Sequence, residues 1–279
     1  MLIVLIGASA LLALAGCGSA EPSPPATASS PRPGASLPRD PTRLAGLLAT
    51  TTERLHGEIE AWTRHGDPAR GGAPKGVTLL ALQQQRIYRR LTPERELGAR
   101  VLARLPRAVA GEARDTLAAR RALAAIPSSG RGRPRIRVAS PEPAGRLREH
   151  YLRAQRRFGV PWTLLAAVNF VESSFGRLRN ESTAGARGPM QFMTSTWRAY
   201  GLGGEIEQPR DAILGAANYL HANGAPGNPR RALFAYNHSR NYVDAVMRFA
   251  SRVRHDPRAF YEYYAWQVYV GDKRLTGPR

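Results

Sequence analysis

Cysteine and lysine are both scarce in this chain of 279 residues. Cys17 is the only cysteine, so no intramolecular disulfide can form and a cysteine-based metal site is excluded. Lys75 and Lys273 are the only lysines, and arginine supplies nearly all of the formal net charge of +20. This charge favours contact with anionic polymers, although a solvated basic surface explains it equally well. No zinc-finger spacing, RNA-recognition motif or Walker sequence accompanies it, so specific nucleic-acid binding has no further support.

The sequence also lacks the alternation of apolar and polar residues that is typical of strands. Its apolar residues recur at helical spacing, as in Leu44, Leu48 and Leu55 near the start and in Val246 and Val253 near the end. Glycine and proline interrupt these stretches. We therefore predict a mainly α protein.

The N-terminal apolar stretch, residues 1–15, is shorter than the roughly 20 residues that span a bilayer. Its length is typical of the apolar part of an export signal. The following Leu14-Ala15-Gly16-Cys17 resembles the lipobox of bacterial lipoproteins. That resemblance implies cleavage before Cys17 and its acylation, which would anchor the protein to a membrane. The alternative is an apolar tail with an incidental cysteine.

Glu172 stands out because it is expected near the C-terminal end of an apolar helix, with Val168 and Phe175 close to it. The helix dipole disfavours a carboxylate there. Desolvation and the dipole should both raise its pKa, as a general acid working near neutral pH requires. An exposed or ion-paired structural glutamate is the alternative.

Three short motifs follow one another around this glutamate. They are Glu-Ser-Ser-Phe at 172–175, Gly-Ala-Arg-Gly-Pro-Met-Gln-Phe at 185–192 and Ala-Tyr-Asn at 235–237. Their order and spacing resemble those of the lysozyme-like lytic transglycosylases with an SLT-type domain, whose pattern is Glu-Ser, Gly-Leu-Met-Gln and Ala-Tyr-Asn. The resemblance covers roughly residues 146–250.

The resemblance implies a lysozyme-like (goose-type) helical catalytic domain and a reaction on peptidoglycan glycan strands. Glu172 would protonate the glycosidic oxygen between N-acetylmuramic acid and N-acetylglucosamine. It would then act as base toward the C6 hydroxyl of the same muramic acid, which attacks C1 and leaves a 1,6-anhydro end. Because this nucleophile comes from the substrate, one catalytic carboxylate suffices where ordinary glycosidases use two. No metal or organic cofactor is implied.

The resemblance also gives substrate-binding roles to Ser173, Met190, Gln191, Tyr236 and Asn237. The amide of Gln191 suits sugar amides and hydroxyls. Ser173 could equally bond the preceding helical turn, and Met190 could fill the core. Asn237 could equally end its helix. In the family the tyrosine points its hydroxyl toward the glutamate, and we prefer this role for Tyr236 over a core position.

This chain departs from the family pattern at two places. Pro189 stands where leucine is usual, which stiffens the loop and removes a backbone donor. His238-Ser239 stands where Ala-Gly is more typical. We expect His238 to be a surface or capping residue rather than a second catalytic base.

Composition and motifs together divide the chain into six segments, because stretches rich in proline and serine cannot bury enough apolar surface to fold. We expect the aromatic-rich tail to pack back on the domain before it. The segments are a lipoprotein signal peptide at 1–16, a flexible tether at 17–42, a helical module of unknown role at 43–126, a linker at 127–143, the catalytic domain at 144–255 and the tail at 256–279.

These features predict an enzyme of the cell envelope, with peptidoglycan, the membrane and anionic wall polymers as partners. Three alternatives remain open. A lysozyme-type hydrolase would use the same glutamate with a positioned water and leave reducing ends. A catalytically silent peptidoglycan-binding lipoprotein would bind without cleaving. A basic polyanion-binding protein would lose its ligand steeply as ionic strength rises.

Overall fold

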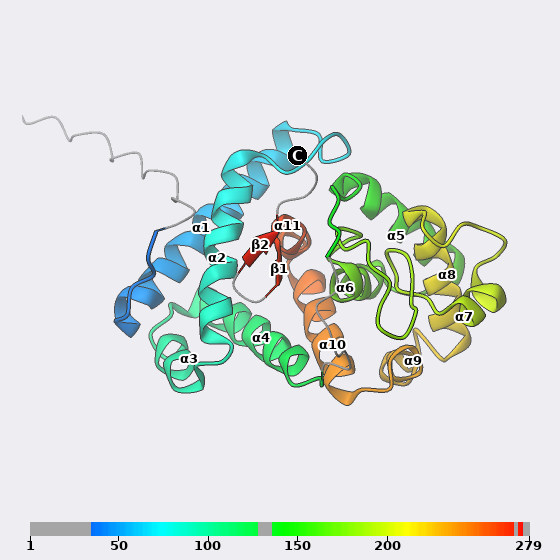
Figure 1. Cartoon of the computed structure of the whole chain (residues 1–279). Helices are drawn as coiled ribbons and strands as arrows, with labels where there is room; N and C mark the ends of the chain where they lie inside the picture. The colour runs from blue at the N-terminus through cyan, green and yellow to red at the C-terminus, as the bar shows by residue number, and fades with distance from the viewer. Residues whose placement is uncertain (1–34, 128–135, 271–272, 276–279) are drawn as a thin grey trace, which may run out of the picture.

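The computed structural model describes residues 35–127, 136–270 and 273–275. The predicted signal peptide, Cys17 and the first part of the tether lie outside these residues. The described residues form eleven helices and two short strands, so the predicted mainly α fold is confirmed (Figure 1). The elements are α1 (Pro41–His65), α2 (Lys75–Leu91), α3 (Arg95–Leu102), α4 (Arg107–Ala124), α5 (Ala144–Phe158), α6 (Trp162–Ser173), α7 (Thr194–Tyr200), α8 (Pro209–Ala222), α9 (Pro229–Tyr236), α10 (Arg240–His255), α11 (Arg258–Ala265), β1 (Val268–Val270) and β2 (Lys273–Leu275).

Helix ends follow local sequence signals. Asp40 accepts a hydrogen bond from the backbone N–H of Arg43 at 2.8 Å and so caps the first turn of α1. Gly159 ends α5 in the left-handed conformation with φ of 70°, a conformation that glycine adopts without a steric penalty. Pro161 precedes α6, where a missing N–H costs no helical hydrogen bond.

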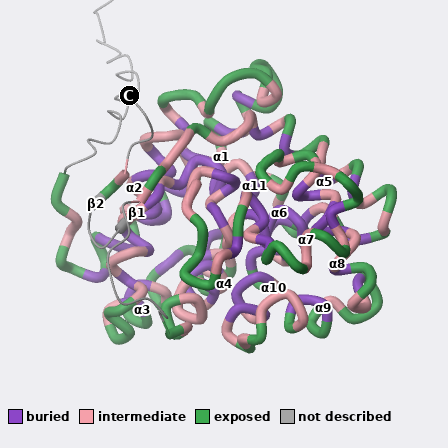
Figure 2. The backbone as a smooth tube through the Cα atoms, turned by 45° about the vertical axis from the view of Figure 1, so that its right-hand side comes forward, coloured by how far each residue is buried: buried purple, intermediate pink, exposed green. Residues whose placement is uncertain are grey.

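The module at 43–126 and the domain at 144–255 share one hydrophobic core. Helix α10 packs against α4 on one side and α6 on the other, and α11 contacts α1 and α2. Figure 2 shows the buried backbone running through α6, α10 and α11. The buried residues of the two parts form one continuous cluster. The boundary between a module and a domain therefore stays a prediction from the sequence.

The aromatic tail packs back on the helices before it, as the sequence predicts. Phe170 of α6 stacks on Tyr263 of α11 with ring centroids 5.1 Å apart. Phe170 also makes edge-to-face contacts with Phe249 and Trp266, with ring centroids 5.0 Å and 5.9 Å apart. Such rings bury large apolar areas, and each well-oriented pair adds roughly 0.5–1.5 kcal/mol. The tail thus packs on α6 through these rings and also contacts α1 and α2 through α11.

Extended segments are few but include two that sequence periodicity did not indicate. Strands β1 and β2 form an antiparallel pair with Val268 opposite Leu275. Part of the predicted linker lies beside the segment that follows α6, because Val138 and Leu178 form an antiparallel bridge. Next to this bridge, the backbone N–H of Ala139 donates to the carbonyl of Arg177 at 2.9 Å. These pairings are too short to give a period-2 pattern.

Four ionisable side chains meet where the two parts of the chain join. They come from α1 (His56), α4 (Glu112), α10 (Arg252) and α11 (Glu262). Arg252 Nη2 donates to Glu112 Oε2 at 2.7 Å, and His56 Nε2 lies 3.6 Å from Glu262 Oε2. Burial and the charge of Glu262 raise the pKa of Glu112 to about 7. Arg252 is therefore an important compensating charge in this cluster.

None of the helices in the described part of the chain is both long enough and apolar enough to cross a membrane.

Candidate functional site

Glu172 is the penultimate residue of α6, and the backbone turns sharply just after it. Ser174 and Phe175 have φ of 52° and 63°, in the left-handed region that residues with a Cβ rarely adopt. Gln191, in the second motif, has φ of 49°. Such conformations cost about 1–3 kcal/mol each and tend to cluster at functional sites.

The carboxyl group of Glu172 is half-buried and has a specific partner. Tyr242 of α10 donates its hydroxyl to Glu172 Oε1 at 2.7 Å. Burial raises the pKa of Glu172 to about 7, and the Tyr242 hydrogen bond opposes this rise because it favours the charged form. A carboxyl with this pKa holds or releases a proton near neutral pH, which is the property predicted from the sequence.

Helix α6 holds the second motif through the carbonyl oxygen of Pro189. Asn169 Nδ2 donates to this oxygen at 2.8 Å, and Ser173 Oγ, one helical turn further on, donates to the same oxygen. Asn169 is itself fixed by the hydroxyl of Tyr151, which donates to Asn169 Oδ1 at 2.8 Å. These bonds use only the carbonyl of Pro189, so proline meets their needs as well as leucine would.

The second motif closes into a tight loop. Arg187 and Phe192 exchange two backbone hydrogen bonds, each of 2.9 Å. Gly188, with φ of 72°, passes against the carbonyl oxygen of Ile206, where a Cβ would clash. Only glycine meets both conditions. Gln191 extends its amide to the carbonyls of Gly188 at 3.0 Å and Asn180 at 3.3 Å.

The hydroxyl of Tyr236, which was expected to point toward Glu172, makes its hydrogen bond elsewhere. It donates to the backbone carbonyl of Met190 at 2.6 Å, and the bond to Glu172 comes from Tyr242 instead. Both tyrosines lie near the carboxyl group, and its charge helps to raise their pKa values beyond the effect of burial. Tyr236 thus joins α9 to the second motif.

The remaining sequence-predicted residues fall into two groups. Ser173 and Met190 are fully buried, which favours their structural alternatives: the serine bonds backbone, including the N–H of Gly176 at 2.8 Å, and the methionine fills the core. Gln191 and Asn237 are partly exposed, and Asn237 also ends α9. His238 is exposed and lies edge-on to Phe234, as expected of a surface residue.

An aromatic row leads away from the site. Tyr236 lies 5.9 Å from Phe192 and 5.5 Å from Tyr219, measured between ring centroids. Phe192 contacts Trp197 at 5.3 Å, and Tyr219 contacts Tyr200 at 4.9 Å. Trp197, Tyr200 and Tyr219 are partly exposed. Partly exposed aromatic rings offer apolar faces together with polar edges, a combination that suits contact with sugars.

A polar cavity of about 300 Å³ lies beside the second motif. Its lining includes Arg137, Arg179 and Arg187, with Asn180, whose carbonyl accepts from Gln191. Glu172 is not among the lining residues. The cavity therefore adjoins the loop but is separate from the carboxyl group.

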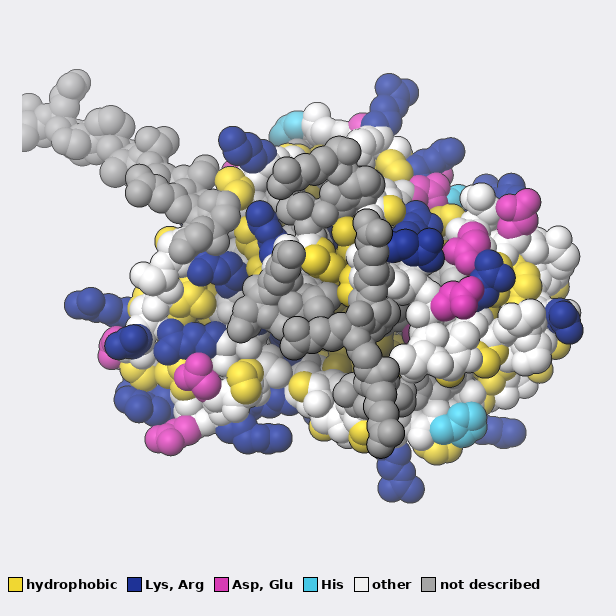
Figure 3. Space-filling view, viewed as in Figure 1, with side chains coloured by type: hydrophobic (Ala, Val, Ile, Leu, Met, Phe, Trp, Pro, Cys, Tyr) yellow, Lys and Arg dark blue, Asp and Glu magenta, His cyan; other side chains and the backbone are white. Residues whose placement is uncertain are grey.

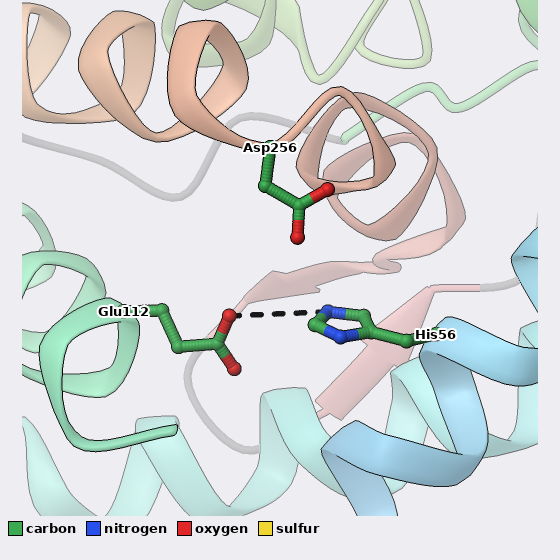
Figure 4. Close-up of side chains that lie close together, drawn as sticks. All are labelled: His56, Glu112 and Asp256. Carbon is green, nitrogen blue, oxygen red and sulfur yellow. Dashed lines mark ion pairs between the residues drawn. The ribbon is translucent and has the colours of Figure 1, made fainter. Parts of the chain in front are cut away.

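His56, Glu112 and Asp256 form the group that most resembles a metal site in the described residues, with ligand atoms within 4.8 Å of one another (Figure 4). Both carboxylates already accept hydrogen bonds from arginines. Arg252 donates to Glu112 at 2.7 Å, and Arg258 Nε donates to Asp256 at 3.0 Å. Two guanidinium charges oppose a cation at this place. We assign the group to packing of the helices.

Residues 150–254 match the family model described as "Transglycosylase SLT domain". The match begins in α5, ends in α10 and includes all three motifs. The similarity to SLT domains that the motifs predict is therefore found over this part of the chain.

A curated relative agrees with this assignment. Over 122 residues the chain is 33% identical to the "Membrane-bound lytic murein transglycosylase F" of Thiobacillus denitrificans. The match covers 41% of this chain and 26% of the relative, so the chain spans about a quarter of that protein's length. No solved structure matches the chain.

Proposed function

We propose that this protein is a peptidoglycan lytic transglycosylase with Glu172 as its single catalytic carboxyl group, in a catalytic domain at 144–255. The observation that carries the proposal is the half-buried Glu172 with a pKa of about 7, within the matched SLT domain. The name of the relative, a lytic murein transglycosylase, supports the same substrate. Release of 1,6-anhydro ends from peptidoglycan tests the proposal.

In the proposed reaction, protonated Glu172 gives its proton to the glycosidic oxygen between N-acetylmuramic acid and N-acetylglucosamine. The bond from C1 to this oxygen breaks. The C6 hydroxyl oxygen of the same muramic acid bonds to C1, and its proton returns to Glu172. The carboxyl group thus ends the cycle protonated, and no water is consumed. Tyr242 stabilises the intervening carboxylate through its 2.7 Å hydrogen bond.

One carboxyl group is enough for this chemistry, and the surroundings of Glu172 agree with that. Its pKa is set by burial and by Tyr242, with no carboxylate among the causes within the described residues. Ordinary glycosidases place a second carboxylate about 5–9.5 Å away, either to activate water or to attack. A nucleophile supplied by the substrate removes that need.

We assign substrate contacts to the partly exposed Gln191 and Asn237 and to the partly exposed rings of Trp197, Tyr200 and Tyr219. Ser173, Met190 and Tyr236 instead position the second motif, because their contacts are to backbone or core. The five residues to which the resemblance gives substrate binding are thus divided into two that contact substrate and three that position the loop. Peptidoglycan glycan strands would lie across the loop at 187–192.

Replacement of Tyr242 by phenylalanine tests the role of its hydrogen bond. The bond favours the charged carboxylate, so its loss raises the pKa of Glu172 further above the ordinary value. We expect the alkaline limb of the kcat/KM profile for glycan cleavage to move to higher pH. Tyr236→Phe, whose hydroxyl bonds Met190 instead, is the control and should leave the limb in place. An unmoved limb in Tyr242→Phe would rule out this role.

We further propose that the protein is exported to the cell envelope and anchored by acylated Cys17. The lipobox-like sequence and the word "membrane-bound" in the name of the relative support this. Cys17→Ala is expected to move the protein from the membrane fraction to the soluble fraction. A high-salt wash removes retention due to the net charge of +20, since salt screens surface charges. Ser19→Ala is the matched control, and equal retention of both variants after the wash would refute the anchor.

A further inference from the structure

A polar cavity of about 660 Å³ lies beside α5 and the start of α8. Its lining holds ionisable groups of both signs, which come from Glu142, His150, Arg179, Glu205, Arg210 and Asp211. In the space-filling view, positive and negative side chains lie interleaved on the right, the side on which α5 and α8 lie (Figure 3). A cavity of this size with a few convergent polar groups suits a ligand that carries both charges.

Two of the three carboxylates in this lining already have close partners. Glu142 Oε1 lies 3.1 Å from His150 Nε2, and Arg210 Nε donates to Asp211 Oδ1 at 2.8 Å. Arg210 also attracts Glu205, but only at longer range. Within the part of the chain that the structure describes, the side chains of Glu205 and Arg179 make no hydrogen bond or close ion pair. One carboxylate and one guanidinium group are therefore available to a ligand in this cavity.

The backbone fixes the position of Arg179 although its side chain is unpaired. Its N–H donates to the carbonyl of Arg137 at 3.0 Å, and Arg137 Nη2 donates to the carbonyl of Arg179 at 3.0 Å. A guanidinium group binds a carboxylate through two parallel hydrogen bonds. The placement of Arg179 therefore fits a ligand with a carboxylate group.

Arg179 also connects this cavity with the second motif. It lines the smaller cavity of about 300 Å³ as well, so the two cavities meet at its side chain. Gly188 of the second motif lines that smaller cavity. Gln191, to which we assign substrate contacts, donates to the carbonyl of Asn180, the residue after Arg179. The larger cavity thus begins one side chain away from the loop across which a glycan strand would lie.

We propose that the two cavities bind the peptide branch of the peptidoglycan substrate, with Arg179 on a carboxylate and Glu205 on an ammonium group. This inference rests on the proposed function, because it concerns the same substrate. The muramic acid of peptidoglycan carries a short peptide that bears both kinds of group. Four extended residues span about 13–14 Å, which exceeds the width of the smaller cavity. The site would favour strands that carry peptides over bare strands.

Isothermal titration of the full chain with N-acetyl-L-Ala-γ-D-Glu-L-Lys-D-Ala, at about 150 mM salt, tests the peptide site without cleavage. We expect saturable binding that Arg179→Gln weakens about tenfold, in line with a lost charge-assisted hydrogen bond. Arg153→Gln is the matched control, because it removes the same charge from an exposed position on α5 outside both linings. It should change the Kd less than about twofold, as expected of a screened distant charge.

A second peptide tests the role of Glu205. Acetylation of the lysine side chain removes the only ammonium group, since the N-terminus is already acetylated. Glu205→Gln should weaken binding of the lysine peptide about threefold, as for an exposed ion pair, and leave binding of the acetyl-lysine peptide unchanged. The same effect on both peptides would contradict the role of Glu205.

Cleavage assays test whether the bound peptide is the branch of the substrate. Purified peptidoglycan is compared with strands from which an amidase has removed the peptides. Arg179→Gln should raise KM about tenfold on peptide-bearing strands with kcat unchanged, the pattern of lost uniform binding, and should leave KM on bare strands as it was. An equal rise on both kinds of strand, or absence of saturable peptide binding, would overturn the inference. Cleavage of neither kind by the unchanged protein would instead contradict the proposed function, whereas the titration judges the peptide site by itself.

Discussion

Glu172→Gln is expected to reduce glycan cleavage on the order of 10²–10⁴-fold while the fold stays intact, because the amide can neither give nor take the proton. Glu149→Gln is the matched control, since it makes the same chemical change at an exposed position on α5. It should cleave at the rate of the unchanged protein. The measurement is the initial rate of fragment release from purified peptidoglycan. Cleavage by Glu172→Gln within about tenfold of the control would remove Glu172 from the reaction.

Glu172→Gln, which reduces cleavage, is expected to raise the stability of the folded protein. Burial raises the pKa of Glu172 from an ordinary value near 4.5 to about 7, so the folded protein loses stability as pH rises through this interval. Glutamine does not ionise and avoids this loss. Glu172→Gln should therefore be more stable than the unchanged protein at about pH 8, by up to about 3 kcal/mol, with a smaller gain near pH 4. Urea denaturation at both pH values measures the difference.

Arg252→Met is expected to lower the free energy of unfolding by about 3–5 kcal/mol. Arg252 donates to Glu112 at 2.7 Å and lies near Glu262, which is 1% exposed, so its removal leaves buried negative charge without compensation. The pKa of Glu112, already about 7, should rise further. Protonation then relieves the repulsion, so the loss should be larger at about pH 8 than at about pH 5.

Arg248→Met provides the control for this prediction. Arg248 lies one turn earlier on α10 and pairs with Asp115 at 3.0 Å, but both side chains are exposed. Exposed pairs contribute about 0–1 kcal/mol, so this variant should unfold almost like the unchanged protein. Urea denaturation of both variants compares the two ion pairs. Similar losses would show that Arg252 is not an important compensating charge for the buried carboxylates of Glu112 and Glu262.

The sequence predicted the helices and the electrostatic character of Glu172 because both depend on local features. Apolar spacing, prolines at helix starts and Gly159 at a helix end act within a few residues. The raised pKa of Glu172 comes from burial, which the apolar composition of its helix indicates. Short extended pairings such as Val138 with Leu178 depend on distant partners and leave no periodic signal.

The partners of Glu172 were harder to predict for the same reason. The ring of Tyr242 is buried on the same helix as Val246 and Val253, but its hydroxyl reaches across to α6. A buried tyrosine hydroxyl needs a hydrogen-bond partner, and that requirement was the available signal. Asn169 offered a similar one, as a fully buried amide one turn before Ser173. Spacing along the chain does not indicate which distant group the side chain of Tyr242 or Asn169 would contact.

The measurement that tests the central claim most directly is mass spectrometry of the fragments that the protein releases from purified peptidoglycan, beside its Glu172→Gln variant. A lytic transglycosylase releases fragments that end in 1,6-anhydro-muramic acid, one water lighter than hydrolysis products, and its Glu172→Gln variant should release none. Fragments with reducing ends would contradict the central claim and indicate a lysozyme-type hydrolase. A folded protein that releases no fragments would contradict it too, and would indicate a peptidoglycan-binding protein without catalysis.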